Sequence, residues 1–277
     1  MTPDSAGFDP ASYVFSQPSA PTAIRASTVL PAHRENVELR TADGHKLVGE
    51  LALPESGDIK ATLITLHPLP THGGFMDSHV YRKASYRLPA LAGIAVLRFN
   101  TRGTSSPRGA STGEFEEGIG ERLDVEAAVR FAVDRGLPNR WLVGWSFGTE
   151  LALMYGAKEP VASEVEGAIL LSPPLHRATD VHLKEWADSG KPLKVLVPEH
   201  DDYLQPAAAT ERFSVVPQAR IMGVDGAKHL WVGEKHAGRV LNEIVAEVLP
   251  SGAGGTASGT AAPLPHEWNG PVATASA

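Results

Sequence analysis

Cysteine is absent from this sequence, which excludes disulfide bonds, thiolate metal sites and a cysteine nucleophile. Blocks of Lys or Arg are absent too, and the formal net charge is -7 at pH 7. We therefore expect neither nucleic acid nor an anionic membrane as a partner. The first residues, MTPDSAGFDPAS, have neither the basic start nor the apolar core of a secretory signal, and no apolar run reaches transmembrane length. Together these absences predict a cytoplasmic globular protein.

Bulky apolar residues are scarce at both ends of the chain and dense between them. Residues 1–34 contain many Pro, Ser and Ala without a sustained periodicity, so we expect an N-terminal arm. Residues 250–277 have the composition of a flexible low-complexity tail. The 35–249 segment between them is predicted to form one domain.

The 35–249 segment has the pattern of an α/β protein. NVELRTADGHKLVGELALP predicts an antiparallel hairpin that turns at Asp43-Gly44. Continuous apolar runs then alternate with helical patterns, as expected for parallel strands covered on both faces. The runs are ATLITL (61–66), GIAVLRF (93–99), RWLVGW (140–145), GAILLS (167–172), LKVLVP (193–198) and ARIMGV (219–224). This order predicts a mostly parallel, doubly wound sheet with ligands at the carboxyl ends of its strands.

The sequence Gly144-Trp145-Ser146-Phe147-Gly148 lies between a predicted strand and a predicted helix. A strand that turns abruptly into a helix strains the serine backbone and brings the flanking positions too close together for a Cβ atom. The helix N-terminus also aims free N–H groups at the serine oxygen. We therefore predict that Ser146 is a nucleophile on a nucleophile elbow. A structural Gly-Ser-Gly turn is the alternative, since G-x-S-x-G arises by chance in roughly one in ten chains of this length.

A serine nucleophile needs a base to take its proton and an acid to orient that base. His229 follows the last predicted strand, whereas His236 lies inside the final helix and His200 precedes the candidate acid. Asp201 follows the preceding strand and is the predicted acid, with Asp202 as the alternative. The order serine, acid, histidine is the order that accompanies this kind of elbow. The sequence therefore predicts a Ser–His–Asp catalytic triad.

An oxyanion hole needs two backbone N–H groups, one of them from the residue after the nucleophile, here Phe147. The second is expected from the loop LHPLPTHGGFMDSHVYRK, which begins at the end of the 61–66 strand. Pro68 and Pro70 have no N–H group, so Leu69 is the predicted donor at this bend.

The same loop contains His67, His72, Asp77 and His79, which raise the alternative of a metal site. No recognised ligand spacing is present among them. We therefore expect neither a metal nor a cofactor.

Three segments, HPLPTHGGFMDSHV, LRFNTRG and GWSFGTELAL, resemble the small lidless hydrolases often called dienelactone-hydrolase-like or α/β-superfamily hydrolases. The resemblance extends over roughly residues 35–249 and implies the α/β-hydrolase fold. It assigns the nucleophile, acid and base to Ser146, Asp201 and His229, and the oxyanion donors to the two residues named above. Dienelactone hydrolases proper have a cysteine nucleophile, whereas this chain has a serine.

Only Pro173 to Gly190 separate two of the predicted strands, so we expect no large cap domain. The pocket should be open and shallow, and the loop 101–118 is the expected substrate-selecting rim. The predicted pocket walls are Phe147 and the substrate-binding residues Trp145, Pro173, Leu175, Trp186 and Trp231.

The predicted function is hydrolysis of a small-molecule carboxylic ester with a short acyl chain through an acyl-enzyme. Two alternatives remain. The same residues could serve a peptidase or thioesterase, or the fold could belong to a non-catalytic binding protein. The sequence predicts no oligomeric state.

Overall fold

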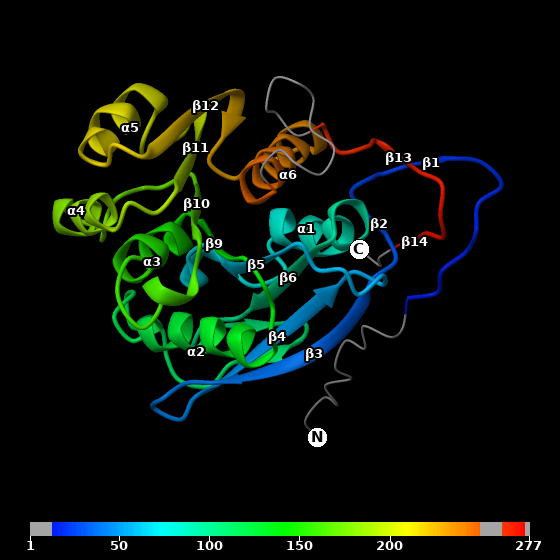
Figure 1. Ribbon diagram of the computed structural model, residues 1–277, viewed down its shortest axis with the longest axis horizontal. Helices are drawn as coiled ribbons and strands as arrows, with labels where there is room; N and C mark the ends of the chain where they lie inside the picture. Colours follow the sequence, from blue (N-terminus) through cyan, green and yellow to red (C-terminus); the bar gives the residue numbers. More distant parts are fainter. Residues whose placement is uncertain (1–12, 250–261, 275–277) are drawn as a thin grey trace.

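The central element of the computed structural model is an eight-stranded sheet with the strand order β12-β11-β10-β9-β5-β6-β4-β3 (Figure 1). The structure describes residues 13–249 and 262–274. The eight strands are β3 (His33–Arg40), β4 (Lys46–Leu53), β5 (Ala61–Leu66), β6 (Ile94–Phe99), β9 (Arg140–Trp145), β10 (Gly167–Leu171), β11 (Leu193–His200) and β12 (Ala219–Lys228). Strands β5, β6 and β9 to β12 are mutually parallel.

Strands β3 and β4 form the predicted hairpin, with Val37 paired to Gly49 and Arg40 paired to Lys46. Gly44 in the turn has φ 93°, a left-handed conformation that glycine adopts without steric cost. Strand β4 then pairs antiparallel with β6. The hairpin thereby extends one edge of the parallel sheet.

Helices cover both faces of the sheet. Apolar side chains of α1 and α6 pack on one face, and those of α2 to α5 pack on the other. The helices are α1 (His79–Ala92), α2 (Glu121–Asp134), α3 (Phe147–Tyr155), α4 (Asp180–Ser189), α5 (Pro206–Arg212) and α6 (Glu234–Val248), with short 3-10 helices η2 (Pro70–His72), η3 (Ala162–Glu164) and η4 (Phe213–Val215). The predicted doubly wound α/β-hydrolase fold is confirmed.

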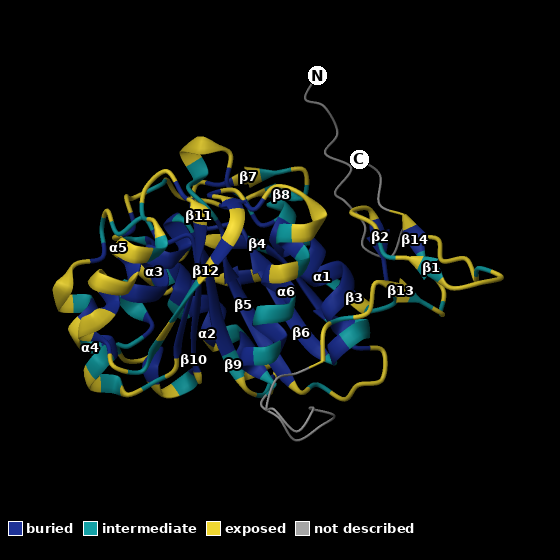
Figure 2. Cartoon of the chain, turned by 90° about the horizontal axis from the view of Figure 1, so that it is seen from above, coloured by how far each residue is buried: buried dark blue, intermediate teal, exposed yellow. Residues whose placement is uncertain are grey.

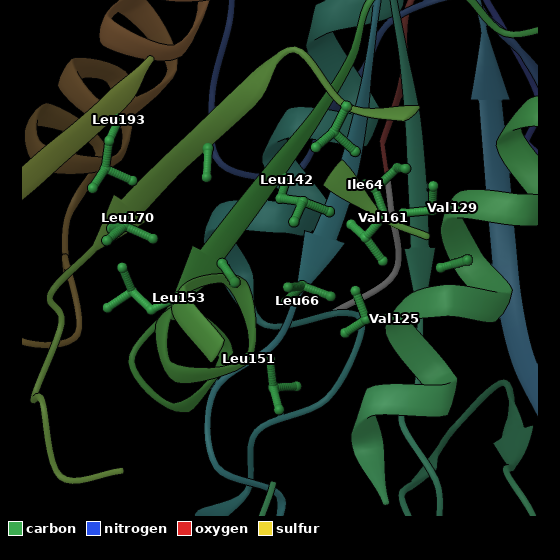
Figure 3. Close-up of a cluster of buried hydrophobic side chains, with 14 of the residues drawn as sticks. Ile64, Leu66, Val125, Val129, Leu142, Leu151, Leu153, Val161, Leu170 and Leu193 are labelled. Carbon is green, nitrogen blue, oxygen red and sulfur yellow. The ribbon is translucent and has the colours of Figure 1, made fainter. Parts of the chain in front are cut away.

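Successive residues of each buried strand alternate between the two helical layers. In β5, Leu63 lies in the layer with α1 and α6, whereas Ile64 lies in the layer with α2 and α3. Figure 3 shows the second layer, where Ile64, Leu66 and Leu142 lie among residues of the neighbouring helices. A strand covered on both faces has no polar side, which explains its continuous apolar run.

The N-terminal arm pairs with the C-terminal segment. Strand β1 (Thr22–Ala23) pairs with β13 (Glu267–Trp268), and β2 (Thr28–Val29) pairs with β14 (Ala273–Thr274). These segments lie side by side at one end of the molecule (Figures 1 and 2). Part of the segment expected to be a flexible tail therefore forms short strands, while its residues 250–261 and 275–277 lie outside the described residues.

Candidate active site

Ser146 lies at the sharp turn between β9 and α3, where it has φ 52° and ψ -115°. A positive φ is uncommon for a residue with a side chain. A Cβ atom on Gly144 would lie 2.3 Å from the carbonyl oxygen of Gly148, and one on Gly148 would lie 1.9 Å from that of Leu66. Both flanking positions therefore require glycine, as the sequence analysis predicted.

Ser146, His229 and Asp201 form a hydrogen-bonded chain. The Ser146 Oγ lies 2.8 Å from His229 Nε2, and His229 Nδ1 lies 2.9 Å from Asp201 Oδ2. A carboxylate only accepts, so Nδ1 carries the proton and Nε2 is free to accept the serine proton. Asp202 is exposed at the next position. The structure thus brings Asp201 rather than Asp202 to the histidine.

The loop after β11 holds Asp201 in its charged form. Burial by itself would raise the pKa of this carboxyl group, but the hydrogen bond from His229 opposes that effect. The backbone N–H groups of Tyr203 and Leu204 also donate to Asp201 Oδ1, at 2.9 and 3.3 Å. The net result is a pKa below the ordinary value for aspartate, which favours a carboxylate beside the histidine.

The backbone carbonyl oxygen of His229 accepts hydrogen bonds from two side chains. Trp145 Nε1 donates to the His229 carbonyl oxygen at 3.2 Å, and Ser172 Oγ donates to the same oxygen at 3.0 Å. The Trp145 side chain is buried, so its contact with His229 replaces the role of pocket wall expected from the sequence.

The other two predicted tryptophan walls are also core residues. Trp186 and Trp231 have no exposed surface, and Trp186 Nε1 donates to the Leu153 carbonyl oxygen within the core. A side chain without exposed surface cannot line an open pocket, so both assignments are corrected. Pro173 is buried as well, whereas Leu175 keeps a partly exposed side chain.

The two backbone groups proposed from the sequence as oxyanion donors lie on adjacent loops. Leu66 in β5 is registered with Gly144 in β9, so the segments that carry Leu69 and Phe147 leave neighbouring strands at the same edge. Within the described chain, neither of these two N–H groups has a hydrogen-bond acceptor. Two unpaired donors beside the Ser146 elbow can stabilise negative charge on a bound oxygen.

The four residues behind the metal alternative point to separate partners. His67 is buried against Thr101, and His79 Nε2 lies 2.7 Å from the Leu230 carbonyl oxygen. Asp77 accepts hydrogen bonds from two arginines, and the exposed imidazole of His72 lies 3.1 Å from the hydroxyl oxygen of its neighbour Thr71. No group of three or more possible metal ligands occurs within the described ranges.

An aromatic rim that the sequence analysis missed lies beside the histidine. The Tyr203 ring packs edge-on against the His229 ring at 4.7 Å between centroids, and against the His176 ring at 5.1 Å. Tyr203 is 56% exposed, so its ring is open to a bound ligand. Neither residue has a motif around it. Only the packing of the two loops reveals the pair.

Glu150 of α3 holds the loop that carries His176. Its buried carboxylate accepts hydrogen bonds from three successive backbone N–H groups, those of His176, Arg177 and Ala178. Arg177 then lies over the Phe147 ring at 5.2 Å and pairs with Glu117. The loop of residues 176–178 therefore forms a second side of the rim.

The expected rim loop 101–118 is fixed to the body of the protein along most of its length. Arg102 donates to Asp124 of α2 through its backbone and its guanidinium group, at 2.8 and 3.0 Å. Its hairpin of β7 (Ser105–Ser106) and β8 (Gly109–Ala110) lies beside β4. Its final part approaches the site, where the Phe115 ring packs on the Phe147 ring at 5.3 Å.

A cavity of about 730 Å³ lies elsewhere, between α1, α6 and residues 264–266. None of the residues discussed for the Ser146 site lines it. Ser146 and its hydrogen-bonded partners therefore lie outside this cavity. No helix within the described ranges has the length and hydropathy needed to span a membrane.

Comparison with known proteins agrees with this architecture. A family model described as alpha/beta hydrolase fold matches residues 71–213. An uncharacterized protein of Rickettsia prowazekii (strain Madrid E) is 31% identical over 134 residues, which are 47% of this chain and 52% of that protein. The chain thus matches about half the length of this curated relative.

Solved structures show the same likeness over more of the chain. An α/β serine hydrolase without a lid from Xanthomonas campestris is 26% identical, with a TM-score of 0.60 over 79% of this chain and 94% of that one. A serine hydrolase homologue from Coxiella burnetii is 22% identical, with a TM-score of 0.64 over 78% and 97%. An esterase of Pyrococcus furiosus is 21% identical, with a TM-score of 0.61 over 79% and 92%.

Proposed function

The chain belongs to the α/β-hydrolase fold family, and on that premise we propose that it is a serine hydrolase that cleaves carboxylic esters through an acyl-enzyme. The observation that carries this proposal is the hydrogen-bonded chain from Ser146 through His229 to Asp201, with both heavy-atom distances below 3 Å. A nucleophile, a base and an orienting acid in this arrangement constitute a catalytic triad.

The reaction begins when Ser146 Oγ attacks the ester carbonyl carbon while His229 Nε2 takes the hydroxyl proton. The carbonyl electron pair moves onto oxygen, where the N–H groups of Leu69 and Phe147 form the oxyanion hole. The intermediate then expels the alkoxide, which takes the proton from His229. Water repeats the sequence on the acyl-enzyme, releases the acid and restores Ser146. Asp201 stabilises the imidazolium in both steps.

The proposed substrate is a small ester with a short acyl chain. Only α4 and its flanking loops lie between β10 and β11, which leaves no cap to enclose a long chain. The rim offers Tyr203 beside His229, and His176 and Leu175 on the neighbouring loop. The leaving group must approach His229 to be protonated, so we place it against Tyr203. The cytoplasmic location expected from the sequence stays a prediction.

A fluorophosphonate probe tests the nucleophile. The probe should label the wild-type protein, and Ser146→Ala should abolish both labelling and ester turnover. Ser163→Ala, at an exposed serine in η3, serves as the matched control and should keep both. Labelling that persists at another serine in Ser146→Ala would overturn the assignment. Parallel panels of p-nitrophenyl esters, thioesters and peptide amides separate an esterase from a thioesterase or peptidase.

A further inference from the structure

His67 occupies a buried position at the start of the proposed oxyanion loop and has two different hydrogen-bond partners. Its Nε2 lies 3.0 Å from the backbone nitrogen of Thr101, and its Nδ1 lies 2.7 Å from the carbonyl oxygen of Pro68. The side chain is 1% exposed.

These partners leave a single tautomer. A backbone N–H can only donate, so His67 Nε2 must be the unprotonated nitrogen that accepts from Thr101. A carbonyl oxygen can only accept, so Nδ1 carries the proton and donates it to Pro68. Burial lowers the pKa of His67 to about 4, so the ring is neutral near pH 7. A neutral ring with its proton on Nδ1 cannot exchange these roles without breaking both bonds.

The carbonyl group that His67 holds belongs to the same peptide unit as the Leu69 N–H. A trans peptide is planar, with its C=O and N–H pointing in opposite directions, so fixing the oxygen also fixes the direction of the N–H. Gly74 packs closely against the same unit, since a Cβ atom at this position would lie 2.1 Å from the Pro68 oxygen. The Leu69 carbonyl oxygen then accepts the N–H groups of His72 and Gly74 at 3.0 Å each.

We propose that His67 is a positioning residue for catalysis, whose Nδ1–H holds the Pro68–Leu69 peptide so that the Leu69 N–H points at the developing oxyanion. The inference rests on the proposed function, since it needs an ester carbonyl at Ser146. Thr101 also contributes to this arrangement, because the hydrogen bond from its backbone N–H to His67 Nε2 keeps the proton of His67 on Nδ1.

Two substitutions separate the bond to Pro68 from mere filling of space. His67→Asn places an amide nitrogen close to the Nδ1 position and can keep the bond to the Pro68 oxygen. His67→Gln carries its amide farther out, where it reaches the Thr101 side but not Pro68. Removing one oxyanion donor costs about 10²–10³ in kcat. A misaligned donor should cost less, so we expect His67→Gln to lose about 10- to 100-fold in kcat with KM within about threefold, and His67→Asn to recover most of that loss.

The ratio of kcat/KM for an ester to that for the matching thionoester provides the readout that a structural role would not change. Sulfur is a weak hydrogen-bond acceptor, so a thionoester gains little from the oxyanion hole. The ratio should fall about 10-fold or more in His67→Gln and return toward the wild-type value in His67→Asn. His72→Asn, the same change at an exposed position of the same loop, should alter neither kcat nor the ratio. Thermal unfolding followed by circular dichroism shows that each variant is folded.

The outcomes separate the two proposals. If the wild-type protein hydrolyses no ester and the fluorophosphonate probe does not label Ser146, the proposed function fails. If the wild-type protein is active and folded His67→Gln keeps its kcat, or loses activity on the ester and the thionoester equally, the positioning role of His67 fails while the proposed function stands.

Discussion

Acidification should destabilise the folded protein through His67. The pKa of this buried imidazole is about 4 in the folded chain, against an ordinary value of about 6.5 when it is exposed by unfolding. Between these two values the unfolded chain binds a proton that the folded chain does not bind. The free energy of unfolding therefore falls as the pH decreases from about 6.5 to about 4.

The size of the effect follows from the same two values. At about 1.4 kcal/mol per pKa unit, the full loss is about 3 kcal/mol, and most of it falls between pH 7 and pH 4.5. That is a large part of the total stability of an ordinary domain. The partners of the ring, Thr101 and Pro68, carry no charge, so burial is the cause that lowers the pKa.

Urea unfolding followed by tryptophan fluorescence at pH 7 and pH 4.5 measures the loss in the wild-type protein and in His67→Asn. An asparagine does not titrate, so the variant should lose about 2–3 kcal/mol less than the wild-type protein over this interval. Carboxylates such as Glu50, whose pKa is lowered to about 2, titrate in both proteins and cancel in the comparison. His72→Asn should behave as the wild-type protein does. Equal losses in the wild-type protein and His67→Asn would refute the reasoning.

Three further predictions concern the site and its rim. Asp201→Asn should lower kcat on the order of 10⁴-fold, the size that loss of the orienting acid has in serine proteases, and Asp202→Asn should stay close to the wild type; the reverse ranking in steady-state kinetics would transfer the role. Glu150→Gln should lower the free energy of unfolding in urea by about 1–3 kcal/mol, because an amide nitrogen would face a backbone N–H of the 176–178 loop and leave it unpaired; unchanged stability would show that the carboxylate does not anchor this loop. In a series from acetate to palmitate, kcat/KM should stop rising after the first few carbons, since each CH₂ gains about 0.8 kcal/mol only when it is enclosed; a continued rise would indicate a closed acyl pocket.

The sheet was predictable because its strands carry a strong local signal. Each of β5, β6, β9, β10 and β11 is buried on both faces, so its apolar run is continuous and its bounds differ from the prediction by at most a few residues. Strand β12 runs to Lys228, beyond the apolar stretch that ends at Val224, and its pairing with β11 shifts register near Pro198. Irregular pairing of this kind leaves no apolar pattern in the sequence.

The placement of the three central site residues was predictable from chain order. Strand ends at one edge of a parallel sheet lie together, so the ends of β9, β11 and β12 bring Ser146, Asp201 and His229 to one place. The sequence alone could not decide between Asp201 and Asp202, because the two aspartates are adjacent and differ only in where their side chains point. Asp201 faces His229, whereas Asp202 is exposed.

The walls of the pocket were not predictable, because burial of an aromatic residue depends on which elements pack around it. Trp186 was predicted to line the pocket, yet α4 packs it against the Leu153 carbonyl oxygen of α3. Tyr203 and His176, which do face the rim, come from two loops distant in sequence. The pairing of β13 with β1 is a similar case, since two-residue strands have no periodicity to detect.

Backbone strain around the site was predictable at the Ser146 elbow, where flanking glycines mark it, but not in the neighbouring loops. Non-glycine residues with positive φ within the described ranges are Glu117, Asn139, Ser146, Ser172, Leu175 and Trp231. All of them except Asn139 lie in loops that surround the Ser146 site. Strain of this kind costs of order 1–3 kcal/mol per residue and persists only where the surroundings fix it.

Two of these strained residues are held by hydrogen bonds to neighbouring strands. Ser146 N donates to the Leu171 carbonyl oxygen, and Ser172 N to that of Leu196, each at 2.9 Å. The neighbouring strand ends thereby hold both strained serines. A glycine would indicate a left-handed backbone conformation in the sequence. These positions instead carry side chains that contact their neighbours, as Ser172 contacts His229. The fold thus stabilises at its carboxyl edge a geometry that the local sequence opposes.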